Sequence, residues 1–260
     1  ITPGVAHITV AGDKKVIAEK LKKYGPVTIY DINGNPVSDA PPAALPSNVS
    51  ARSVIQKHID ATGGKDNWEK VKDMKMVMSM DINNMKINVN TTRKFPNKLL
   101  IDVNMNGMSL QKIVFDGTQG YMMVQGQKKA FEEDEKKKYT DEANMSEELD
   151  YLNPNHKISL KGTEKVDDED AYVVEVTKPS GNVVTEYYNV KSGLKIKSEE
   201  TEESPQGKQT QVTFYLNYKD GKGGLKFPNT IKQSGGPTGM MEMTLQSIDL
   251  NSGISDDVFK

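Results

Sequence analysis

Apolar and polar side chains alternate over most of the chain after residue 73, and a period of two is typical of β-strands with one buried face. The clearest case is a row of methionines that falls on one face: Met74, Met76, Met78 and Met80. Ser79 and Asp81 fall on the other face. All thirteen methionines of the chain lie between Met74 and Met243. The pattern therefore predicts a β-rich region in which one sheet face is rich in thioethers.

The same alternation predicts about twelve strands. Their expected ranges are 74–82, 85–93, 98–105, 108–115, 119–125, 157–164, 171–178, 183–190, 194–201, 209–218, 225–233 and 240–250. Short Asn-Asn, Asn-Gly and Asp-Gly links separate many of them, and such links favour antiparallel hairpins. We expect a mainly β fold with some α: a curved antiparallel sheet of about 11–12 strands that forms an open half-barrel covered by helices.

Two segments supply the expected covering helices. Ser50 is a favourable N-cap for a helix that ends at Gly63-Gly64, and a short helix is expected near residues 67–71. Residues 131–149 are polar and have high helical propensity. On the first helix, His58 shares the apolar face, so we interpret it as a packed core histidine and not as a ligand.

The first 37 residues form a separate pattern of strand, helix and strand. A strand is expected at 6–11, a helix capped by Asp13, a strand at 27–30 and a turn at Asn33-Gly34. Three prolines fall within residues 38–49, which favours an extended linker. The predicted organisation is therefore 1–37 as a small unit, 38–49 as the linker and 50–260 as the half-barrel domain. Because the chain starts at Ile1 without a signal peptide, we expect it to be a processed product or a piece of something longer.

Composition excludes several functions. The net charge is −2 and only Arg52 and Arg93 are arginine, which disfavours nucleic-acid binding. No apolar run is long enough to span a membrane. The chain has no cysteine, and its three histidines lie far apart. It has no phosphate loop and no nucleophile elbow. We predict no catalytic residue, no metal and no cofactor.

The methionine row admits two interpretations, a half-buried strand on a soft core or a surface that faces an apolar ligand. Methionine is flexible and polarizable, which suits surfaces that adapt to irregular apolar ligands. The candidate ligand-binding residues lie on three successive strands: Met74, Met76, Met78, Met80, Met85, Ile87, Val89, Leu99, Ile101, Val103 and Met105.

Four motifs resemble the lipoprotein-sorting carrier family, the LolA/LolB-like half-barrel. They are Thr92–Leu99 (a basic residue, then any residue, then Pro), Val114–Tyr121 (a strand with an Asp-Gly turn), Tyr188–Leu194 and Tyr218–Pro228. They occur in the family's order within residues 50–260. The resemblance implies a periplasmic or outer-membrane-facing protein of a Gram-negative bacterium, with a cavity between sheet and helices that receives acyl chains of lipids or lipoproteins.

Residues 1–37 resemble the C-terminal end of a pitrilysin/insulinase-type zinc peptidase domain, through Ala6–Asp13 and Tyr30–Val37. Three functions stay open. The first is non-enzymatic binding of lipid or lipoprotein acyl chains. The second is an accessory or partner-binding domain C-terminal to a zinc peptidase of the insulinase type, whose apolar concave face holds a peptide or a partner domain. The third is a structural domain whose interior is filled by its own side chains.

Overall fold

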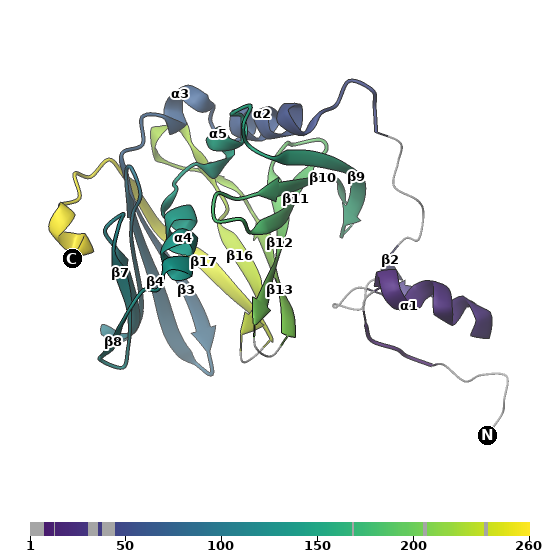
Figure 1. Cartoon of the computed structure of the whole chain (residues 1–260), viewed down its shortest axis with the longest axis horizontal. Coiled ribbons are helices and arrows are strands. Elements are labelled where there is room, and N and C mark those ends of the chain that lie inside the picture. The colour runs from purple at the N-terminus through teal and green to yellow at the C-terminus, as the bar shows by residue number, and fades with distance from the viewer. Residues whose placement is uncertain are drawn as a thin grey trace.

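The computed structural model describes residues 8–12, 14–30, 36–37, 45–167, 169–204, 207–236 and 239–260. The main sheet of these residues has 13 strands, and its neighbouring strands pair antiparallel (Figure 1). Its strands in chain order are β3 (Asp73–Ile82), β4 (Met85–Lys94), β5 (Lys98–Met105), β6 (Met108–Phe115), β7 (Gly120–Val124), β8 (Gln127–Ala130), β9 (Ile158–Val166), β10 (Glu169–Thr177), β11 (Val183–Asn189), β12 (Lys195–Ser204), β13 (Gly207–Leu216), β16 (Thr230–Gly236) and β17 (Gly239–Leu250).

The spatial order of the strands is β8-β7-β6-β5-β4-β3-β17-β16-β13-β12-β11-β10-β9. The chain thus builds one wing outward from β3, returns through the helical insertion to the far edge, and closes the centre last with β17 beside β3. The two edge strands, β8 and β9, do not pair with each other, so the sheet is open. This confirms the predicted mainly antiparallel, unclosed half-barrel.

The helices gather on one side of the curved sheet. They are α2 (Ala51–Ala61) and α3 (Lys65–Trp68) before the sheet, and α4 (Glu133–Ala143) and α5 (Glu147–Tyr151) between β8 and β9. Figure 1 shows α4 within the curve of the sheet and α2, α3 and α5 along the upper ends of its strands. Smaller elements are α1 (Lys14–Leu21), η2 (Lys22–Tyr24), β1 (Ile29–Tyr30), β2 (Pro36–Val37), β14 (Lys219–Asp220), η3 (Lys222–Gly224), β15 (Lys226–Phe227) and η4 (Asp256–Phe259).

Local sequence explains these elements. Ser50 accepts a hydrogen bond from the backbone N–H of Ser53 and caps α2, as predicted. Three tight turns at one end of the strands place residues such as Asn83, Asn106 and Gln125 at positive φ, which two-residue hairpins require. Asn and Gly tolerate this conformation best, so the Asn-Asn and Asn-Gly pairs fix where these strands reverse.

Several predicted boundaries were wrong. The single helix expected at 131–149 is two helices, because Asn144 is extended and its side-chain oxygen accepts from the N–H of Ser146. The strand expected at 225–233 is divided at Pro228 into β15 and β16. Strand β8 was missed, since its sequence Gln-Lys-Lys-Ala has no apolar alternation.

At the N-terminus, residues 8–11 are not in a strand, and the rest of the strand expected at 6–11 lies outside the described residues. Asp13, the proposed cap, and the Asn33-Gly34 turn also lie outside them. The expected helix is present as α1.

Candidate ligand-binding site

The strand register places the eleven predicted residues on one face of the sheet. Side chains of directly paired residues point to the same side. Three rows cross β3, β4 and β5: Met74–Arg93–Leu99, Met76–Thr91–Ile101 and Met78–Val89–Val103. Met80, Ile87 and Met105 form a fourth row, and Met85 pairs with Ile82. We call these eleven predicted residues the methionine face.

Burial falls along the methionine face from one end to the other. Met74 is 4% exposed and Met78 6%, whereas Met85, at the β3–β4 turn, is 44% exposed. Met76 and Met80 are half-buried. The face is therefore covered near α3 and open near the hairpin turns. Ser79, on the opposite face, is also buried, because it lies between Thr244 and Asn88 on the flanking strands.

Two hydrophobic clusters cover the buried end. The first joins Met74 and Met76 to Trp68, Val71 and Met145, and also contains Leu225, Phe227, Leu245, Ile248 and Leu250. The second joins Leu99 and Ile101 to α4 and its flanks through Phe115, Phe131, Ala143, Ile113, Met122 and Tyr139. The methionine face is thus partly packed against the protein's own side chains.

Helix α4 is fastened to the methionine face despite its polar sequence. Phe131, just before the helix, stacks on Tyr139 with ring centroids 4.4 Å apart. The ring of Phe131 also lies close to Gly120. A Cβ atom at position 120 would come within 2.4 Å of that ring, so only glycine fits there. Arg93 Nε donates to the carbonyl oxygen of Glu142 at 2.8 Å. Arg93 and Thr91 lie in the same rows as the methionine face, and the sequence analysis did not name these two polar residues.

A groove of about 680 Å³ lies beside this covered end, between α3, the segment α4–α5 and the β4–β5 turn. Its lining mixes apolar side chains such as Trp68, Val71 and Met145 with polar ones such as Asp141 and Lys178. None of the eleven predicted residues lines it. Three side chains nevertheless link the groove to the methionine face, because Trp68, Val71 and Met145 line the groove and also pack in the cluster that contains Met74 and Met76.

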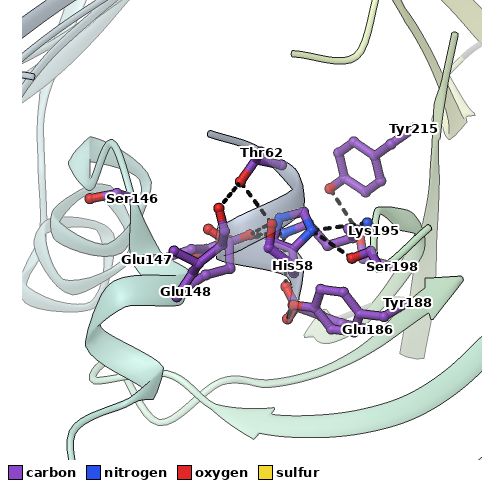
Figure 2. Close-up of polar contacts among 12 residues, drawn as sticks. His58, Thr62, Ser146, Glu147, Glu148, Glu186, Tyr188, Lys195, Ser198 and Tyr215 are labelled. Carbon is purple, nitrogen blue, oxygen red and sulfur yellow. Dashed lines mark hydrogen bonds and ion pairs between the residues drawn. The ribbon is translucent and has the colours of Figure 1, made fainter. Parts of the chain in front are cut away.

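The other wing of the sheet carries a buried cluster of charges, which the sequence analysis missed (Figure 2). The ammonium of Lys195 lies 2.7 Å from Glu148, 3.0 Å from Glu186 and 3.6 Å from Glu147. His58 Nε2 lies 3.7 Å from Glu148. We call these five residues the ionic cluster. One signal was available: Glu186 shares the period of two with Val184 and Tyr188, so it had to point into an apolar layer.

Lys195 fixes the charge state of the ionic cluster. Burial alone would raise the pKa of Glu148, but the charge of Lys195, together with His58 and the hydrogen bonds to the carboxylate, lowers it below its ordinary value. Burial raises the pKa of Glu186 even though Lys195 opposes this, and Tyr188 Oη donates to its carboxylate at 2.5 Å. Burial lowers the pKa of His58, the opposing effect of Glu148 notwithstanding. His58 is therefore a packed neutral histidine, with Nδ1 3.2 Å from the N–H of Lys195 that donates to it.

The three carboxylates could in principle hold a metal ion, since their oxygen atoms lie within 4.8 Å of one another. Lys195 already supplies the positive charge at that point, at hydrogen-bond distance from Glu148 and Glu186. A divalent ion would have to displace a buried ammonium. The cluster is best described as an internal anchor that joins α5 to α2, β11 and β12.

The geometry defines an open half-barrel whose helices cover an apolar concave face, and the comparisons agree. No protein-family model matches the sequence, and no curated protein matches it. Among solved structures, a LolA superfamily protein from Nitrosomonas europaea is similar with a TM-score of 0.51 and 16% identity, over 82% of this chain and 98% of that one. A domain described as an outer membrane lipoprotein-sorting protein, from Vibrio parahaemolyticus, gives 0.53 and 12%, over 81% and 96%.

These similarities establish that the chain has the LolA-like fold, as the sequence motifs indicated. Identities this low carry the fold alone. No helix among the described residues is long and apolar enough to cross a membrane.

Proposed function

We propose that this protein binds acyl chains of lipids or lipoproteins and is a carrier, not an enzyme. The acyl chain lies along the methionine face, between the sheet and the segment α4–α5. The proposal includes a periplasmic location, which the lipoprotein-sorting description of a structural neighbour supports.

One observation carries this proposal: the open groove and the methionine face share one hydrophobic cluster. Trp68, Val71 and Met145 line the groove and also pack with Met74 and Met76. An acyl chain that enters the groove needs only side-chain rearrangement to reach the sheet. Methionine side chains rearrange easily, since they are unbranched and have three rotatable bonds.

Acyl chains match this surface energetically. Each buried methylene contributes about 0.8 kcal/mol, without any demand for directional bonds. Within this face, Val89, Val103 and Ile101 are half-buried and therefore accessible to a ligand. Thr91 and Arg93 add two polar side chains to the same side of the sheet.

The test compares two neighbouring positions on β4. Val89 lies on the methionine face, and Asn88, the preceding residue, lies on the opposite face. We expect Val89→Asp to weaken uptake of a fluorescent fatty-acid probe at least about tenfold, because its carboxylate would be buried against the acyl chain of the probe. Asn88→Asp adds the same charge to the other face and should leave uptake unchanged.

Folding of each variant is checked first by circular dichroism. Val103→Asp, which pairs with Val89 on β5, repeats the test at a second half-buried position. Probe uptake that is equal in folded Val89→Asp, Val103→Asp and Asn88→Asp variants would show that the methionine face is ordinary core.

A further inference from the structure

Three hairpins that reverse at the same end of the sheet expose large apolar side chains. The turns β3–β4, β5–β6 and β7–β8 all lie at the strand ends away from α3, and Figure 1 shows the ends of β3, β4, β7 and β8 there. Met85 is 44% exposed, Met108 68% and Val124 43%. We call these three turns, residues 82–85, 105–108 and 124–127, the rim.

The rim continues the methionine face to its open end. Met108 pairs with Met105, and Met85 is two residues from Ile87 on the same strand, so both point to the concave side. Val124 pairs with Gln111, which lies in the row of Val103. An exposed apolar edge of this kind marks an interaction site more often than a random surface does.

The charges beside the rim indicate the partner. Lys86 follows Met85, and Lys128 and Lys129 follow the β7–β8 turn, whereas Asp81 is the single carboxylate in residues 80–88, 103–112 and 122–130. Lys129 is paired with Glu135 at 3.5 Å. Lys86, opposite Asp81 in the ladder, and Lys128, whose Nζ lies 3.5 Å from the ring centroid of Tyr121, are the exposed lysines next to the turns. Exposed thioethers flanked by lysines match a surface that is apolar within and anionic at its boundary.

We propose that the rim docks onto an anionic lipid bilayer, with Met85, Met108 and Val124 in the interface and Lys86 and Lys128 at the headgroups. Docking in this pose brings the open end of the methionine face against the lipid. Apolar contact combined with attraction of lysines to anionic headgroups suffices for reversible membrane binding.

The experiment measures co-sedimentation of the full chain with vesicles of phosphatidylglycerol mixed with phosphatidylcholine, and with vesicles of phosphatidylcholine alone. We expect salt-sensitive binding to the first only. Lys86→Glu should weaken it at least about fivefold, and Met108→Ser should also weaken it. The matched controls, Lys161→Glu on the far edge strand β9 and the exposed Val183→Ser on β11, should bind like the parent protein.

A second measurement locates the contact. The chain has a single tryptophan, Trp68 on α3, at the end of the methionine face that lies away from the rim. Brominated lipids should quench the added indole of a Met108→Trp variant and leave the fluorescence of Trp68 in the parent protein unchanged.

The proposal is overturned if the protein binds neither vesicle, if Lys161→Glu weakens binding as much as Lys86→Glu, or if Trp68 is quenched. It is also overturned if light scattering shows a dimer that Met108→Ser dissociates, because a second copy would then cover the rim. Uptake of the fatty-acid probe is measured without vesicles, so loss of docking and loss of acyl binding are distinguishable.

Discussion

The two wings of this sheet solve the same packing problem with different chemistry. The wing from β3 to β7 turns methionine, isoleucine and valine toward the helices. The wing from β9 to β12 packs α2 and α5 on Val174, Val176 and Tyr188, and inserts the ionic cluster among them. Both wings belong to one continuous sheet.

This difference assigns a different freedom to each wing. Contacts between thioethers and aliphatic groups have no strict geometry, so side chains can exchange partners at little cost. The ionic cluster has no such freedom, because a buried charge that loses its partner keeps its desolvation cost. We infer that α5 is held in place, while the apolar side chains that cover the methionine face, such as Met145, can adjust to a ligand without movement of the helices.

Both arginines of the chain support this division. Arg52 on α2 donates to four carbonyl oxygens at the end of α5 and just beyond it: those of Tyr151, Asn153, Pro154 and His156. Arg93 makes one such bond to α4, at Glu142. The end of the insertion near the ionic wing is therefore fixed by more polar contacts than the end on the methionine face.

The largest predicted effect comes from removing the cation of the ionic cluster, in the wing from β9 to β12. Lys195→Met leaves Glu148 and Glu186 buried without a cation, and we expect the free energy of unfolding to fall by about 3–5 kcal/mol. Urea denaturation followed by circular dichroism measures this change. The matched control is Lys161→Met, which removes a half-exposed pair with Glu175 and should cost at most about 1 kcal/mol. Equal losses in the two variants would show that the ionic cluster is no anchor.

A smaller effect concerns the pH dependence of the same wing. Burial lowers the pKa of His58 below its ordinary value of 6.5. On acidification through 6.5 the unfolded chain therefore binds a proton before the folded one does, and stability falls as pH falls. The groups that face His58 are Glu148 and Glu147 on α5, Lys195 on β12 and the carbonyl of Gly193, with the ring of Tyr188 5.1 Å away.

We expect His58→Gln to remove this part of the pH dependence, so that the variant loses less stability than the parent between pH 7 and pH 5. The measurement is the difference in unfolding free energy between parent and variant over that range. Other groups titrate in both proteins and cancel in the difference. Parallel stability curves would mean that His58 is protonated equally in the folded and unfolded chains.

Alternation was enough to predict the sheet and the methionine face. In a strand with one buried face, the apolar residues occupy every second position, so the sequence shows which side chains point toward the core. Met74 to Met80 and Leu99 to Met105 show this. Strand β8 was not predictable in the same way, since a short polar edge strand buries nothing.

The ionic cluster was harder to predict because it joins residues far apart in sequence. Glu148, Glu186 and Lys195 each resemble a solvated charge in their own segment, and only the packing of α5 on β11 and β12 makes them partners. Charge runs on polar helices are usually solvated, so Glu147 and Glu148 gave no warning. Strand parity at Glu186 was the one local signal.

The smallest predicted effect lies outside both wings. The hydrophobic clusters of the described residues draw on Val49 and later positions, and none includes a residue of α1 or β1. If residues 1–37 are a separate unit and 38–49 a linker, neither wing depends on them for stability. We therefore expect deletion of residues 1–47 to leave the melting temperature within about 2 °C of the full chain. Differential scanning calorimetry on both chains measures this. A fall of many degrees would place the boundary elsewhere and would mean that one wing is completed by the N-terminal segment.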